Sequence, residues 1–140
     1  MRSPSGSTRS RSAFALVAGL ALLGGCSSDP MSEVTYNLAP SATYSEDEVR
    51  EAADVVVDHW TALSEVLEDF GSVTYTGELD SDYWASQYDG DEAIVLTVDF
   101  ITNDKAPEMG LNGDDTYTDY KEILVRNDGG PWRVVDGGYG

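Results

Sequence analysis

Apolar residues recur at spacings of three and four along residues 45–70, which is the pattern of a helix that buries one face. The positions on this face are Val49, Ala52, Ala53, Val55, Val56, Trp60, Leu63, Val66, Leu67 and Phe70. Ser45 and Glu48 have the spacing of a capping box, and Gly71 is suited to the position just beyond a helix end. The sequence therefore predicts a helix of about 25 residues that begins after Ser45 and ends before Gly71.

Alternation of apolar and polar residues predicts four strands, at residues 72–79, 93–101, 117–126 and 132–135. In the strongest of them Ile94, Leu96, Val98 and Phe100 share one side, which we expect to be buried. One helix followed by about four antiparallel strands predicts a two-layer α+β domain.

The segments that connect the predicted strands have the composition of turns and loops. Residues 127–131 combine Asn, Asp, Gly and Pro, and several of these residues tolerate a positive φ, so the last two strands are expected to form a hairpin. A single helical turn is expected at residues 82–88, and a long polar loop at residues 104–116.

Three segments also carry a resemblance to known domains. Residues 92–100 (EAIVLTVDF), 123–130 (ILVRNDGG) and 132–139 (WRVVDGGY) resemble a group of small exported bacterial domains of uncharacterised function. The closing W-R-V-x-D is similar to the last strand of the nuclear transport factor 2-like superfamily. The resemblance implies one long N-terminal helix packed on a curved antiparallel sheet, and no agreed activity. A cystatin-like variant is an equal alternative, because the nuclear transport factor 2-like proteins usually have more N-terminal helix than this chain offers.

The N-terminus has the pattern of a secretory signal. An apolar run at residues 13–23 follows three arginines, and its 11 residues are too few to cross a membrane, which takes about 20. The run ends in Leu23-Gly24-Gly25-Cys26, which resembles the lipobox of bacterial lipoprotein precursors. That resemblance implies a signal peptide at residues 1–25 and a lipid, such as diacylglycerol with palmitate, on Cys26. The alternative is an ordinary secreted protein with a chance cysteine near its cleavage site.

Cysteine content and charge exclude several classes of site and partner. Cys26 is the only cysteine, so the chain forms no intrachain disulfide and no cysteine-rich zinc site. The formal charge is −18, and removal of residues 1–25 would leave 5 basic and 26 acidic residues, a charge of −21. Such a chain has no basic patch for nucleic acid, and anionic lipid head groups repel it. The acidity favours a solubility role, with a cationic partner or bound calcium as alternatives.

The pattern divides the chain into three parts. After the signal at 1–25, residues 26–44 are rich in Ser, Thr, Asn and Pro and predict a lipid-anchored flexible tether. Tyr36, Leu38 and Tyr44 are able to dock on the domain, which would order part of the tether. Residues 45–140 are expected to form one α+β domain with a single core.

Acidic residues in the loops supply the metal candidates. Asp80-Ser81-Asp82 begins like an EF-hand loop, but Trp84 and Ala85 lie where its turn glycine belongs, and no Glu occupies the twelfth position. An irregular calcium site is left as an alternative, built either from Asp89 and Asp91 or from Asn112, Asp114 and Asp115. We otherwise predict no cofactor.

Few residues are candidates for catalysis. His59 is the only histidine, and without a clear Ser or Asp partner it is expected to pack at the rim of the core. If the cone-shaped superfamily applies, Asp99 with Tyr75, Tyr117 or Tyr120 is the candidate isomerase or dehydratase-like (lyase) site, because members of that superfamily use Asp, His and Tyr.

The aromatic and basic residues have other roles. Tyr83, Trp84 and Tyr88 form a candidate binding patch, although the favoured role of Trp84 is to close one end of the core. Arg126 and Arg133 are expected to pair with a sheet carboxylate such as Glu122.

These patterns together predict a lipoprotein on the outer side of the cell membrane. Its domain is expected to bind an envelope protein or polymer without catalysis. A calcium-stabilised surface domain and a small cone-fold enzyme are the two alternatives.

Overall fold

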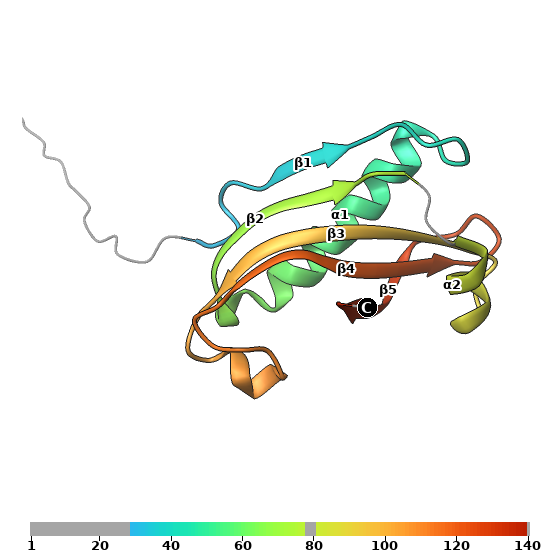
Figure 1. Ribbon diagram of the computed structural model, residues 1–140. Coiled ribbons are helices and arrows are strands. Elements are labelled where there is room, and N and C mark those ends of the chain that lie inside the picture. The colour runs from blue at the N-terminus through green and yellow to red at the C-terminus, as the bar shows by residue number, and fades with distance from the viewer. Residues whose placement is uncertain (1–28, 78–80, 140) are drawn as a thin grey trace, which may run out of the picture.

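The computed structural model describes residues 29–77 and 81–139, which form one α+β unit (Figure 1). A five-stranded sheet has the order β1-β2-β3-β4-β5. Its strands are β1 (Thr35–Leu38), β2 (Leu67–Tyr75), β3 (Glu92–Thr102), β4 (Thr116–Arg126) and β5 (Arg133–Gly138). The helices are α1 (Glu46–Ala62), α2 (Ser81–Gln87) and two 3-10 turns, η1 (Ser64–Val66) and η2 (Ala106–Met109). The α+β class is confirmed, but the sheet is mixed and has a fifth strand.

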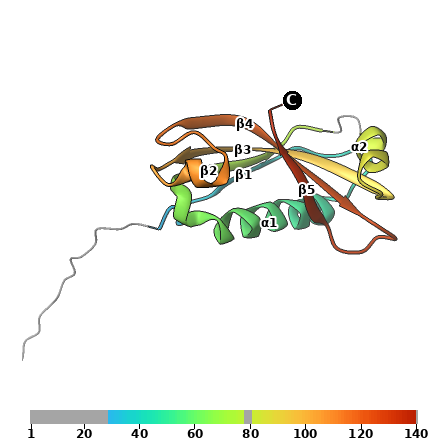
Figure 2. The ribbon, with the colours of Figure 1, turned by 90° about the horizontal axis from the view of Figure 1, so that it is seen from below.

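The helix α1, which follows β1 in the chain, covers one face of the sheet (Figure 2). Its predicted capping box is present: the Ser45 hydroxyl accepts from the Glu48 amide at 3.1 Å, and a Glu48 carboxylate oxygen accepts from the Ser45 amide at 2.7 Å. The helix has 17 residues and ends at Ala62, so the prediction of a helix that continues to residue 70 was wrong.

The error has a structural reason in β2, where Leu67, Phe70 and Val73 are all buried at a spacing of three. An ideal strand would place every second residue on one face. Two register shifts in the pairing of β2 with β3, after Leu67 and after Phe70, restore these side chains to the core. A bulged strand therefore has the same three-residue spacing of buried positions as a helix.

The fifth strand comes from the segment that we predicted as a tether. β1 pairs in parallel with residues 72–75 of β2, and the Pro30 carbonyl accepts from the Phe70 amide at 3.0 Å. The Tyr44 hydroxyl donates to the Ala93 carbonyl at 2.8 Å. The prediction of a flexible tether up to residue 44 is corrected by these contacts, because the folded unit includes Pro30 and β1.

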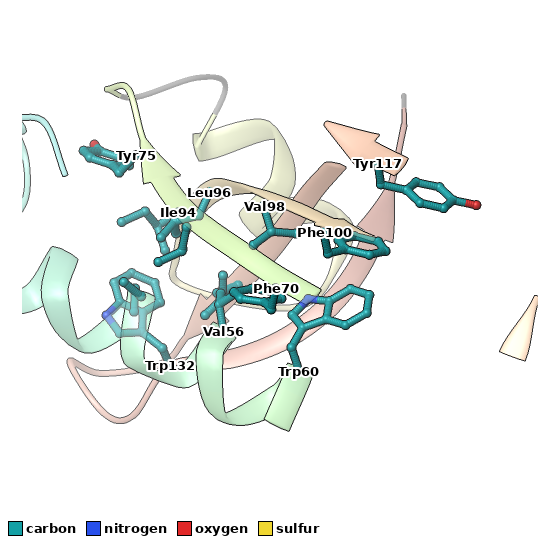
Figure 3. Close-up of a cluster of buried hydrophobic side chains, with 14 of the residues drawn as sticks. Val56, Trp60, Phe70, Tyr75, Ile94, Leu96, Val98, Phe100, Tyr117 and Trp132 are labelled. Carbon is teal, nitrogen blue, oxygen red and sulfur yellow. The ribbon is translucent and has the colours of Figure 1, made fainter. Parts of the chain in front are cut away.

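The main core lies between α1 and the sheet (Figure 3). Ile94, Leu96, Val98 and Phe100 face α1 as predicted, and the Trp60 ring lies 4.4 Å from the Phe100 ring between centroids. A second, small cluster forms on the other face of the sheet, where α2 packs Ala85 against Ala93 and Val125.

The predicted hairpin of the last two strands is confirmed by the pairing of β4 with β5. Asp128 and Gly129 in its turn have φ values of 54° and 67°. The single helical turn expected at residues 82–88 is α2. In the described ranges, no helix combines the length and the apolar character that crossing a membrane requires.

Candidate functional site

A pocket of about 380 Å³ opens on the α1 side of the sheet. Its walls come from three places: the last turn of α1, the segment around η2, and the facing strands β4 and β5. The lining residues are His59, Trp60, Leu63, Met109, Leu111, Tyr120, Glu122, Val134, Val135, Asp136 and Gly137. Most of this wall is apolar, with a few polar groups, which is the usual composition of a small-molecule site.

Glu122 is the unusual residue of this pocket. Glu122 lies on the face of β4 that packs toward α1, and only 2% of the residue is exposed to solvent. Oε1 accepts from the indole Nε1 of Trp60 at 3.2 Å, whereas Oε2 is buried and has no hydrogen-bond partner among residues 29–77 and 81–139. A buried carboxylate with one unpaired oxygen costs stability unless another group pairs with that oxygen.

Burial controls the ionisation of this group. Desolvation raises the pKa of Glu122 to about 7, the Trp60 hydrogen bond opposes the shift, and the negative charge of Asp136 adds to it. The Glu122 carboxyl group therefore changes between its protonated and ionised forms near neutral pH. Titration in this range is a property of many functional sites.

A bulge in β4 sets the orientation of the pocket residues. Asp119 has a left-handed backbone with φ of 55°, and its amide donates to an Asp99 carboxylate oxygen at 2.9 Å. The register of β4 against β3 shifts at this point. Tyr117 and Tyr120, three residues apart, consequently both pack on Phe100, with ring centroids at 4.8 Å and 5.4 Å.

At Gly137 the backbone of β5 lies close to the Glu122 carboxylate. A Cβ atom at this position would lie 3.0 Å from Oε1 of Glu122 and 3.1 Å from the carbonyl of Lys121. Any side chain at position 137 would have to displace these neighbouring atoms, so the close approach of the two strands favours glycine here. Beside it, one Asp136 oxygen accepts from the Gly137 amide at 2.8 Å, and the other accepts from the Tyr88 hydroxyl.

Two further titratable groups lie in the pocket wall. Desolvation lowers the pKa of His59, which therefore favours the neutral imidazole. Desolvation and then the Glu122 charge raise the pKa of Tyr120, so its phenol keeps its proton. Among the described residues that line the pocket there is no lysine or arginine.

The structure divides the residues of the predicted Asp and Tyr site: Asp99 and Tyr117 line a second pocket, between β2, β3 and β4, whereas Tyr120 lines the Glu122 pocket. Asp99 lies in β3 on the face opposite the core and holds the bulge of β4. The Tyr75 hydroxyl donates to Ser41 at 3.1 Å, and the Tyr117 hydroxyl accepts from the Asn112 amide at 2.9 Å. Only Tyr120 of this set lines the Glu122 pocket, and its acidic neighbour is Glu122 rather than Asp99.

Glu122 was missed because we expected it to pair with an arginine. Arg126 instead contacts Glu48 at 2.6 Å and Glu92 at 2.9 Å, and its guanidinium lies 4.3 Å from the Trp132 ring centroid. These contacts join the start of α1 to the sheet. One sequence signal was available: Glu122 is two residues before Leu124, so it shares the apolar face of an alternating strand.

The acidic metal candidates lie near the two ends of β3. Asp91 accepts from the Asp128 amide at 2.8 Å, and Asp115 accepts from the Thr116 amide at 2.9 Å and the Asn112 side chain at 3.0 Å. Asp89 and Asp114 adopt left-handed turns with φ of 55° and 51°. Within residues 29–77 and 81–139, no three His, Cys, Asp or Glu side chains gather closely enough to hold a metal ion.

The predicted aromatic patch is only partly open. Tyr83 is 55% exposed, and Trp84 packs against the small cluster under α2. The Trp84 and Tyr88 rings stack with centroids 6.4 Å apart, and Tyr88 is hydrogen-bonded to Asp136. Trp84 therefore contributes to packing as well as to this surface. Cys26, the predicted lipidation site, lies outside the described residues.

Comparison of the chain with protein-family models, curated proteins and solved structures finds no match.

Proposed function

We propose that this chain is a lipoprotein, anchored on the outer side of the cell membrane through Cys26, and that its domain binds a small envelope component in the Glu122 pocket. The observation that carries the binding role is the buried Glu122 oxygen without a partner in a largely apolar pocket. A ligand that hydrogen-bonds this oxygen would remove the cost of its desolvation.

The anchor in this proposal is supported by the N-terminal sequence, with its arginines, apolar run and lipobox-like segment. Only residues 27–29 separate Cys26 from Pro30, whose carbonyl pairs with β2. Four residue steps span at most about 14 Å. The lipid would therefore hold the domain close to the bilayer, despite the repulsion between an acidic chain and anionic lipids.

The anchor is tested with Cys26→Ser, which removes the acceptor of the lipid. We expect the variant to leave the membrane fraction or to be missorted, with the circular dichroism spectrum of its folded domain unchanged. Ser28→Ala, two residues away, is the matched control and should stay in the membrane fraction. A Cys26→Ser variant that remains bound to membranes would contradict the anchor.

The binding role is tested by identifying small molecules that copurify with the full chain from its own membranes, using mass spectrometry. Val134→Phe adds a ring inside the pocket and is expected to lower the amount of bound compound at least tenfold, because the ring occupies the ligand volume. Val55→Phe makes the same change on α1 outside the pocket and should retain the compound. Equal occupancy in both variants, or no bound compound in the wild type, would sink this role.

A second candidate function, an isomerase or lyase-like enzyme, is favoured by one observation. Glu122, with its pKa raised to about 7, shares the pocket with the protonated phenol of Tyr120, and these groups suit general base and acid roles. If the wild-type protein converts the copurified compound chemically and Glu122→Gln does not, the domain is an enzyme rather than a binding domain.

A further inference from the structure

We infer that the ligand of this pocket is an organic ammonium ion with an apolar body, whose nitrogen pairs with the Glu122 carboxylate. The inference rests on the proposed binding function and names the chemical class of its ligand. Three properties of the pocket lead to it: the unpaired acceptor, the surrounding aromatic rings and the absence of a competing cation among the described lining residues.

The acceptor requires a ligand that donates. Oε1 of Glu122 is already paired with the Trp60 indole, and Oε2 has no partner in the described part of the chain. An ionised carboxylate only accepts hydrogen bonds, so an anionic or acceptor-only ligand would leave Oε2 unsatisfied. A charged N–H donor forms a shorter and stronger bond with a carboxylate than a neutral donor does.

The walls suit a cation that carries an apolar group. The Trp60 and Tyr120 rings meet edge to face with centroids 6.0 Å apart, and both line the pocket. Aromatic faces attract ammonium groups, most strongly where water is excluded. Leu63, Leu111 and Val134 add aliphatic surface, against which the rest of the ligand would be buried.

The charge of the pocket wall and of the whole chain also favours an ammonium ligand. The neutral form that burial favours for His59 leaves the pocket wall without a positive charge, and Asp136 adds a second carboxylate. The full chain carries a formal charge of −18, which attracts cations and repels anions over long range. A carboxylate or phosphate ligand would be repelled by these carboxylates, and the described lining residues include no arginine or lysine to balance the repulsion.

Binding of the ammonium ion is coupled to release of a proton. Below pH 7 the Glu122 carboxyl group holds a proton, and pairing with the ammonium ion transfers that proton to solvent. The other titratable groups that face Glu122 are His59 on α1, Tyr120 on β4 and Asp136 on β5; the η2 segment contributes only Met109 and Leu111. Affinity should therefore fall by up to tenfold per pH unit below pH 7, and level off above it.

The test is calorimetric titration of the purified full chain at pH 7.5 with benzylammonium, benzyl alcohol and benzoate, which share one ring and differ in charge. We expect benzylammonium to bind at least tenfold more tightly than benzyl alcohol, and benzoate to show no binding. Glu122→Gln should weaken benzylammonium at least tenfold. Glu68→Gln removes one exposed carboxylate from β2, outside the pocket, and should leave the affinity within about twofold.

The wild-type protein supplies a second readout that does not depend on folding of the variant. At pH 6, titration in buffers of different ionisation enthalpy should show close to one proton released for each benzylammonium bound. Equal binding of benzyl alcohol and benzylammonium without proton release would overturn the ammonium class but leave the binding function standing. Failure of benzylammonium to bind at all would also overturn it, whereas the binding function is decided separately, by the copurification experiment with Val134→Phe and Val55→Phe.

Discussion

Glu122→Gln is expected to stabilise the protein relative to wild type by about 3 kcal/mol more at pH 8 than at pH 4.5. The pKa of this carboxyl group is raised from its ordinary value of 4.5 to about 7 in the folded chain, mainly by desolvation. Between these values the unfolded chain has lost the proton and the folded chain still holds it. The contribution of Glu122 to stability is therefore fully present below pH 4.5, declines as the pH rises, and is lost above pH 7.

The measurement is urea unfolding of the wild type and the variant at half-unit steps from pH 4.5 to pH 8. Glutamine keeps an oxygen for the Trp60 indole and does not ionise, so the difference between the two proteins isolates the titration of Glu122. Glu68→Gln, at an exposed position, controls for the loss of one negative charge. Parallel curves for wild type and Glu122→Gln would show that Glu122 ionises normally and would remove the basis for proton-linked binding.

Trp60→Ala is expected to lower the free energy of unfolding by about 3–5 kcal/mol, the usual cost of removing a buried large aromatic side chain. Trp60 is 2% exposed and joins α1 to the sheet, with its ring 4.4 Å from Phe100 and 6.0 Å from Phe70 between centroids. Its loss also removes the hydrogen-bond donor of Glu122, which leaves both carboxylate oxygens without a partner.

Trp60→Phe separates these two effects. It keeps an aromatic ring but removes the indole N–H, so we expect a smaller loss of stability and a further rise in the pKa of Glu122. Tyr83→Ala, at an aromatic residue that is 55% exposed, should change the free energy of unfolding by less than about 0.5 kcal/mol. Chemical unfolding of all three variants at pH 6 checks the order of their stabilities. Equal stability of Trp60→Ala and Tyr83→Ala would contradict the packing of Trp60 between α1 and the sheet.

Local sequence patterns were reliable where the interaction itself is local. The capping box of Ser45 and Glu48 depends on residues three apart, and the structure confirms both of its hydrogen bonds. The alternation in β3 and the turn between β4 and β5 were likewise visible in short segments. The end of α1 was not, because Leu67 and Phe70 satisfy a helical spacing and a bulged strand equally well.

The placement of β1 and the environment of Glu122 depend on contacts between segments far apart in the sequence. β1 carries weak apolar alternation, and its pairing depends on the free edge that β2 offers more than 30 residues later. Arg126 pairs with Glu48 and Glu92, so it does not neutralise Glu122. From the sequence, Glu122 was one of many carboxylates. Its isolation required the Trp60 indole, the Asp119 bulge and the Gly137 backbone to meet around it.

The amino-acid sequence by itself determined the acidic charge, the start of α1, the faces of β3, the β4–β5 hairpin and the α+β class, because each depends on composition or on neighbours along the chain. Only the tertiary structure decided where α1 ends, that β1 belongs to the sheet, and which carboxylate is buried in a pocket. The physical reason is that desolvation is a property of the assembled core. A glutamate has a perturbed pKa only when residues far apart in sequence exclude water from it together.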